Sequence, residues 1–120
     1  MISLIFFCLA AICNAVMDTL VHHFGISVFQ KLNPQFWWPE ISWKNKYVDF
    51  DPAKGHKKLM IDSFSDGWHV FKTLMIVFIC LSIVTYDFFN IPWWLMVIGY
   101  GTLWNIVFNL FYNHILIKKK

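Results

Sequence analysis

The chain has 120 residues, of which 58% are hydrophobic, 20% are aromatic and only 14% are charged. A soluble domain of this size carries far more charge on its surface, so this composition excludes an ordinary globular protein and indicates an integral membrane protein. The formal net charge is +3 and no arginine is present, which argues against a nucleic-acid partner because guanidinium groups dominate the recognition of phosphate and guanine.

The first expected element is a membrane span over residues 1–24, where an apolar run ends beside Gly25, a residue that favours helix termination. The run lacks the basic start of a signal peptide, so we expect it to stay in the protein as an uncleaved helix. Asn14, Asp18 and His22 recur every four residues within it, and this spacing places them along one side of the helix.

The middle segment, residues 25–67, is too short for an independent core and too aromatic to be disordered. Its rings alternate with lysines, a pattern typical of chain that lies at headgroup depth in a membrane. We expect an interfacial segment whose ring anchors, with the tryptophan that follows it, are Trp37, Trp38, Trp43 and Trp68.

Two further spans are expected within residues 68–89 and 91–117, joined by a tight connection and forming an antiparallel helical hairpin over 68–117. Trp93 and Trp94 would mark the membrane interface opposite the middle segment. Gly99 and Gly101 are expected to let neighbouring helices approach closely. A basic tail, 118–120, ends the chain.

Both later spans also carry polar residues at helical spacing. The set at the second span is Asp62, Asp66, His69 and Thr73, and the set in the third is Asn105, Asn109, Asn113 and His114. An ionised side chain near the centre of a spanning helix costs about 3 kcal/mol, so such groups should face a partner or a cavity rather than lipid.

The predicted fold class is therefore an all-α membrane protein with three transmembrane helices: one N-terminal span plus a C-terminal hairpin. Six lysines lie in the middle segment and three in the tail, whereas the connection between the second and third spans has none. The positive-inside rule then places the middle segment and the C-terminus in the cytoplasm and the N-terminus outside. We expect the bacterial inner membrane as the location.

In this orientation the carboxylates and imidazoles collect at the cytoplasmic face. The candidate ligands for a transition metal or zinc are Asp18, His22, Asp66, His69 and His114. Residues that would orient those ligands are Asn14, Thr73, Asn105, Asn109 and Asn113. The alternative, which we favour, is that these polar groups hydrogen-bond across helices and hold the bundle together.

Four stretches resemble parts of uncharacterised small bacterial integral membrane proteins: MDTL at 17–20, NPQFW at 33–37, SWKNKY at 42–47 and DGWH at 66–69. The resemblance covers about residues 17–72. It implies a small membrane protein and no particular activity.

Three classes of function follow from these observations. The first is a structural or accessory protein whose partners are the lipid bilayer and either another membrane protein or further copies of itself. The second is a membrane-embedded metal-dependent enzyme acting on a lipid-type substrate, in which the ion activates water or oxygen. The third is a holin-like lesion protein, which the long middle segment disfavours. A haem held by two histidines is a further option, without a ligand motif to favour it.

Overall fold

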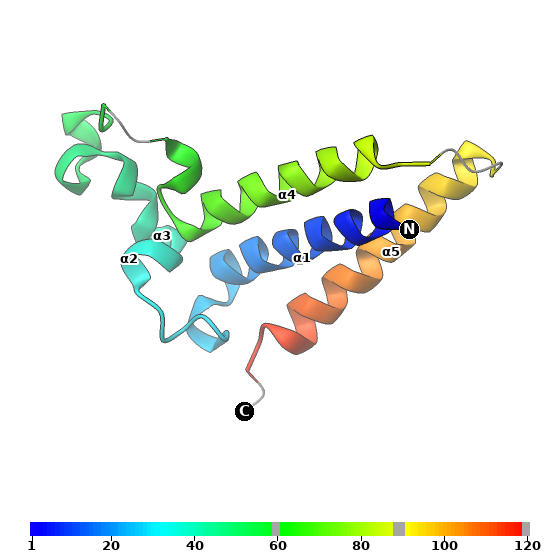
Figure 1. Ribbon diagram of the computed structural model, residues 1–120. Coiled ribbons are helices and arrows are strands. Elements are labelled where there is room, and N and C mark those ends of the chain that lie inside the picture. Colours follow the sequence, from blue (N-terminus) through cyan, green and yellow to red (C-terminus); the bar gives the residue numbers. More distant parts are fainter. Residues whose placement is uncertain (59–60, 88–90, 119–120) are drawn as a thin grey trace.

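A computed structural model describes residues 1–58, 61–87 and 91–118, and these form three long helices and a group of short helical turns (Figure 1). The long helices are α1 (Ile2–His22), α4 (Gly67–Val84) and α5 (Trp93–Leu110), and α5 continues into a wider turn, η6 (Phe111–Ile115). Each is long and apolar enough to cross a membrane. The prediction of an all-α fold with three helices that are long and apolar enough to span a membrane is therefore confirmed for the described residues.

Helix α1 is the centre of the bundle, because it lies between α4 and α5 and packs against both (Figure 1). Ala10, Ala11 and Ala15 on this helix are 0% exposed. Such small side chains let neighbouring backbones approach closely, which is the main source of helix association where water supplies no hydrophobic force. The buried centre of the protein is therefore helix α1 itself.

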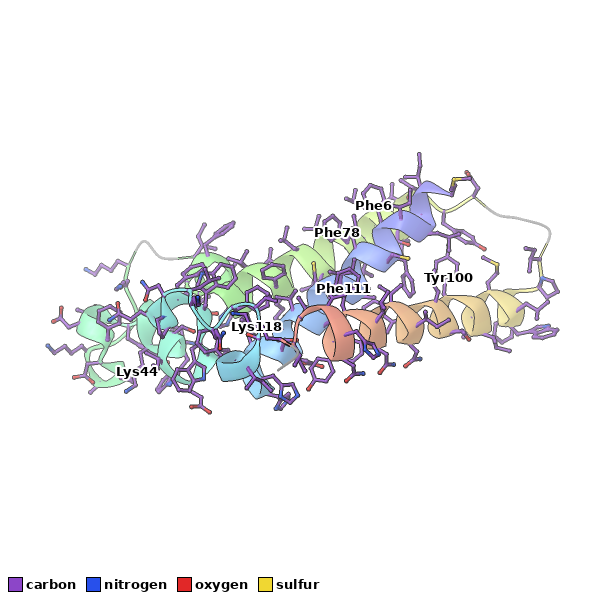
Figure 2. The ribbon with its side chains drawn as sticks, turned by 90° about the horizontal axis from the view of Figure 1, so that it is seen from below. Phe6, Lys44, Phe78, Tyr100, Phe111 and Lys118 are labelled. Atoms are coloured by element: carbon purple, nitrogen blue, oxygen red, sulfur yellow. The ribbon has the colours of Figure 1, made fainter. Side chains whose placement is uncertain are left out.

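The aromatic contacts of α1 point in two directions. Phe6 stacks on Phe78 of α4 with 6.2 Å between ring centroids, and Phe7 meets the edge of Tyr100 of α5 at 4.8 Å. Figure 2 shows Tyr100 on the side of α5 that faces α1. The predicted α4–α5 hairpin is thus not confirmed as a packed pair: the two helices run antiparallel, but α1 separates them along most of their length.

The middle segment folds into short turns at one end of the bundle (Figure 1). Their bounds are η1 (Phe24–Ile26), α2 (Pro34–Trp37), α3 (Pro39–Ser42), η2 (Trp43–Lys46), η3 (Val48–Phe50), η4 (Pro52–Lys54) and η5 (Asp62–Phe64). Asn33 and Asp51 each precede a proline and cap the turn that follows, by accepting a hydrogen bond from the backbone two residues on.

Stacked rings attach this segment to the spans. Phe24, the first residue of η1 after α1, stacks on Trp38 with ring centroids 5.5 Å apart, and Phe29 stacks on Trp37 with centroids 5.6 Å apart. Trp37 also packs against Phe71 of α4, with 6.3 Å between the ring centroids. Since aromatic pairs in these arrangements contribute about 0.5–1.5 kcal/mol each beyond their buried area, the segment is held in place by its rings.

The C-terminus closes the same end of the molecule by backbone pairing with the chain that follows α1. The amide of Val28 donates to the carbonyl of Leu116 at 2.8 Å, and the amide of Lys118 donates to the carbonyl of Ile26 at 2.9 Å. Ser27 lies between these bonds and is buried. Residues 26–28, which follow α1, are thus tied to residues 116–118, which follow η6.

The three glycines on the long helices have different surroundings. A Cβ on Gly67 would lie 2.8 Å from a ring carbon of Trp37, so the first turn of α4 needs glycine to accept that ring. A Cβ on Gly99 or Gly101 would meet no atom of the described residues within 4 Å. The expectation that Gly99 and Gly101 bring helices of this chain close together is therefore wrong, because no described part of the chain covers α5 at either glycine.

We expect Gly67→Ala to lower the free energy of unfolding by about 1–3 kcal/mol, the usual cost of overpacking, although alanine normally favours a helix over glycine. Thermal unfolding of the detergent-solubilised protein measures this change. Gly99→Ala is the matched control and should be neutral or slightly stabilising. A stable Gly67→Ala variant would show that Trp37 does not press on the start of α4 as the structure has it.

Candidate functional site

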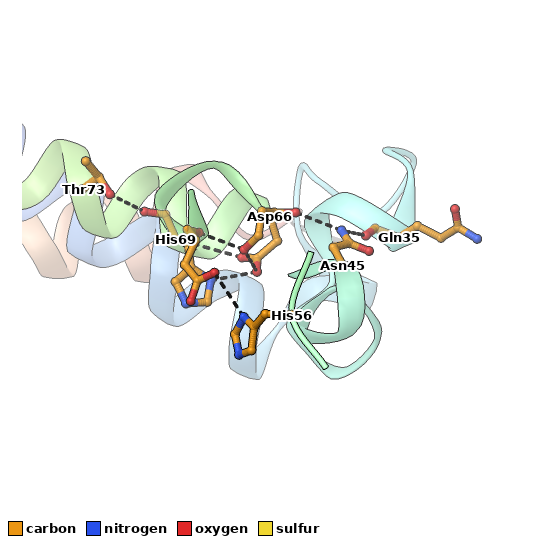
Figure 3. Close-up of polar contacts among 8 residues, drawn as sticks. Gln35, Asn45, His56, Asp66, His69 and Thr73 are labelled. Carbon is orange, nitrogen blue, oxygen red and sulfur yellow. Dashed lines mark hydrogen bonds and ion pairs between the residues drawn. The ribbon is translucent and has the colours of Figure 1, made fainter. Parts of the chain in front are cut away.

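Asp66 lies at the end of the bundle that carries the middle segment, and it is only 2% exposed. It occupies the residue before α4, where its Oδ1 accepts a hydrogen bond of 3.0 Å from the backbone amide of His69. Its Oδ2 accepts from the hydroxyl of Ser65 at 3.1 Å and lies 2.7 Å from Nδ1 of the His69 ring (Figure 3). Aspartate is a preferred helix cap, so the sequence Asp66-Gly67-Trp68-His69 folds locally into this arrangement.

The contact with Asp66 sets the state of the His69 ring. An ionised carboxylate only accepts hydrogen bonds, so Nδ1 of His69 is the donor, and in the neutral ring Nε2 is then an acceptor. The His69 side chain is 27% exposed, and its ring meets the edge of Trp68 with centroids 5.0 Å apart. The pair can therefore act as a base, or offer one nitrogen to an ion, from a partly accessible position.

Asn45 links the middle segment to this pair. Its side-chain amide donates to the carbonyl of Ser65 at 3.0 Å and also to the carbonyl of Gln35 (Figure 3). Sequence reasoning named neither Asn45 nor Ser65 as part of the site. Asn45 lies within the SWKNKY stretch at 42–47, whereas Ser65 directly precedes DGWH and lies outside all four stretches, so the sequence carried a signal for Asn45 alone.

The other predicted metal ligands do not join Asp66 and His69. Asp18 is half-buried on α1, whereas His22 at the end of α1 and His114 in η6 are exposed. Among the residues that the structure describes, no group of three or more His, Cys, Asp or Glu side chains is placed to hold a metal ion. A shared depth along the helices is therefore not enough to bring these side chains together.

Both interpretations of Asn105, Asn109 and Asn113 expected contacts with other helices. The hydrogen bonds that these side chains make among the described residues lie instead within one helical stretch. The side-chain amide of Asn105 donates to the carbonyl of Gly101 at 2.9 Å, and that of Asn109 donates to the carbonyl of Asn105 at 2.8 Å. Asn113 donates to the side-chain oxygen of Asn109 at 3.1 Å. All three are exposed and form a ladder along α5 and η6, and none of these three hydrogen bonds joins α5 to α1.

The remaining polar residues assigned to this site are also bonded locally or half-buried. Thr73 donates its hydroxyl to the carbonyl of His69 at 2.9 Å, one turn earlier on α4. Asn14 is half-buried on α1. Neither contacts the Asp66 carboxylate, so the organised part of the predicted site is the Asp66–His69 pair with Ser65 and Asn45.

A second polar cluster, at the other end of the spans, was not predicted. The hydroxyl of Ser3 donates to the carbonyl of Ser82 at 2.7 Å, while the Ser82 hydroxyl donates to the carbonyl of Ser3 at 2.9 Å. The Ser3 hydroxyl also lies 3.1 Å from that of Tyr100, so the cluster joins α1, α4 and α5. Small hydroxyl residues in apolar runs give little pattern in sequence, which is why the cluster was missed.

An apolar pocket of about 460 Å³ adjoins this second cluster. It lies between the start of α1, the end of α4 and the start of α5, with Phe7, Ile79 and Met96 among its lining residues. This cavity thus lies at the opposite end of α4 from Asp66 and His69, and its lining offers hydrocarbon contact rather than ionisable groups.

Some of the tryptophans are packed against other rings, and others are exposed. Trp37 and Trp38 are half-buried in the ring stacks of the middle segment, whereas Trp43 is exposed. Trp93 and Trp94, at the start of α5, are exposed at the other end of the spans. Two separate groups of rings therefore lie at opposite ends of the apolar helices.

No family model, curated protein or solved structure matches this chain. Its three apolar helices define a small helical protein with a membrane location.

We expect Asp66→Ala to lower the free energy of unfolding by about 2–4 kcal/mol, because it removes a helix cap worth about 0.5–2 kcal/mol and leaves buried donors unpaired. Asp66→Asn keeps an oxygen for the His69 amide and should cost less. The measurement is thermal unfolding in detergent, combined with hydrogen exchange of the first turn of α4.

His69→Ala is the matched control, because it removes the ring but keeps the backbone amide that Asp66 caps. It should leave exchange protection at the start of α4 nearly unchanged. Equal losses of protection in Asp66→Ala and His69→Ala would contradict the assignment of Asp66 as the residue that organises this end of the helix.

Proposed function

We propose that this chain is a small integral membrane protein with a structural or accessory role, whose spans anchor the folded middle segment at the cytoplasmic face of a bacterial inner membrane. The observation that carries the proposal is the bonding of Asp66. Its Oδ1 caps the start of α4 through the backbone amide of His69, its Oδ2 contacts the Ser65 hydroxyl and the His69 ring, and Asn45 ties the middle segment to the same point. The polar residues here build a presented surface rather than a reaction centre.

Pairs of lysine and aromatic side chains support an interfacial position for this surface. The amines of Lys44, Lys46 and Lys57 lie over the rings of Trp43, Tyr47 and Phe50, at 5.3–5.6 Å from their centroids. Lys72 lies over Trp68 in the same way, at 5.0 Å, in the first turns of α4. Rings at headgroup depth beside amines that contact anionic lipid are expected where a helix leaves the cytoplasmic leaflet.

The surface also offers a place for a protein partner. A shallow pocket of about 300 Å³ is lined by aromatic rings, amides and one amine, namely Phe36, Phe50, Phe64, Asn33, Asn45 and Lys57 among others. Phe64 is 63% exposed beside it. Mixed apolar and polar lining with exposed aromatic side chains is typical of protein interfaces.

The accessory role predicts that a photo-reactive amino acid at Phe64 becomes linked to one discrete membrane protein in living cells. The same amino acid at Ile83, which is 70% exposed near the far end of α4, is the matched control and should be linked to lipid alone. Gel analysis and mass spectrometry of the adducts measure both. Lipid adducts at both positions would remove the support for a protein partner at this surface.

One observation favours a second candidate, a membrane-embedded enzyme acting on a lipid-type substrate. The 2.7 Å contact between the buried Asp66 carboxylate and the His69 ring is the arrangement that orients a histidine as a general base or as a metal ligand. The metal-dependent form of this candidate would need further ligands beyond these two residues.

Elemental analysis of the purified protein beside an Asp66→Ala/His69→Ala variant separates the two candidates. The accessory role predicts no stoichiometric transition metal or zinc in either protein after growth in metal-replete medium. A near-stoichiometric ion that is present in the natural chain and lost in a folded double variant would instead establish the metal-dependent enzyme.

A further inference from the structure

We propose that this protein is a homodimer in the membrane, formed by the side of α5 that carries Asn105 and Asn109. The proposal is independent of what the middle segment binds. Its basis is that these amides lie in a membrane-spanning helix, are exposed in the single chain, and can be satisfied by the same side of a second copy.

The position of the asparagine side on α5 follows from helix geometry. Tyr100 points from α5 toward α1 (Figure 2). Asn109 lies nine residues later, which is two and a half turns and therefore the opposite side, and Asn105 lies about 140° from Tyr100. Consistent with this, Asn105 and Asn109 are exposed whereas Tyr100, Trp104 and Phe108 are half-buried.

Both amides lie within the span rather than at its ends. The candidate span runs from Trp93 to Ile115. At 1.5 Å per residue, Asn105 is about 18 Å and Asn109 about 24 Å from its start, inside a hydrocarbon layer about 30 Å thick. Hydrocarbon supplies no hydrogen-bond partner, so an amide at this depth is driven toward protein.

The bonds within the chain use only part of each amide. An asparagine side chain has two N–H donors and an oxygen with two acceptor positions. In the part of the chain that the structure describes, the Asn105 side chain makes one hydrogen bond, to the carbonyl of Gly101, and its oxygen accepts none. The Asn109 side chain donates to the carbonyl of Asn105, and its oxygen accepts from the Asn113 amide, which leaves one of its two acceptor positions. Asn105 and Asn109 therefore each retain one N–H donor and at least one acceptor position on an exposed side chain.

A second copy is the occupant that this chemistry fits. All copies insert in the same direction, so a two-fold axis along the membrane normal brings each asparagine to its own counterpart at the same depth. An amide complements another amide, because each offers a donor and an acceptor. No charged side chain lies between Trp93 and Asn113 to repel a second copy.

The shape of the helix surface fits the same contact. Gly101 lies one turn before Asn105, and a Cβ there would meet no atom of the described residues within 4 Å. A glycine four residues from a small polar residue opens a groove in which a second helix can approach at a right-handed crossing. Gly101, Asn105 and Asn109 are all exposed in the single chain, so this side of α5 is open to a second helix.

The test is disulfide cross-linking in native membranes with Cys8, Cys13 and Cys80 replaced by alanine. Thr102→Cys places a thiol on the asparagine side of α5, and Ile76→Cys places one on the exposed side of α4 as the matched control. Oxidation should give a disulfide-linked dimer through Thr102→Cys and not through Ile76→Cys. No dimer, or equal yields at the two positions, would overturn the proposal.

Further substitutions identify the contact. Adding Asn105→Leu/Asn109→Leu should weaken dimerisation roughly tenfold, because two interhelical hydrogen-bonding contacts are lost. Gly101→Leu should also weaken it by filling the groove, whereas Gly99→Leu should not. Circular dichroism checks that helix content is retained. Unchanged yields in the asparagine variant, or a mixed disulfide with a different protein in place of the dimer, would overturn the proposal.

Discussion

Polar groups inside a bilayer have to be bonded within protein, because hydrocarbon offers them nothing, and this constraint accounts for most of the structure. The short hydroxyl side chains use the nearest carbonyl: Thr19 donates to Ala15 and Thr85 donates to Leu81, each at 2.7 Å along its own helix. Ser3 and Ser82 instead bond to each other and fix α1 against α4. Local bonding and cross-helix bonding are thus both present, and of these two kinds of hydrogen bond only the second joins one helix to another.

The two ends of the spans meet the constraint in different ways. One end has a small hydroxyl cluster beside an apolar pocket, which suits a region surrounded by acyl chains. The other end has a buried carboxylate, ring stacks and lysine–aromatic pairs, and Asp66 joins these to the start of α4. A carboxylate can be buried there because it receives hydrogen bonds from three groups, which offsets the cost of removing it from water.

The asparagines show why a shared pattern in sequence did not give a shared site. Spacing of four residues correctly placed Asn105 and Asn109 on one side of their helix, but spacing does not say toward which neighbour that side turns. In the fold, α5 contacts α1 through Tyr100 and Trp104, so the asparagines turn outward. Similarly, His22 and His114 share the expected end of the molecule with Asp66 and yet do not reach it, because convergence depends on helix rotation.

The number of apolar helices and their approximate bounds were determined by the sequence itself, since each depends on residues that are close together in the chain. The same holds for the local closeness of Asp66 and His69, three residues apart at a helix start. Only the tertiary structure decided that α1 lies in the centre, that Trp37 requires Gly67, and that Ser3 meets Ser82. These contacts join residues far apart in the chain, and the rotation and order of the helices that create them leave no periodic trace in the sequence.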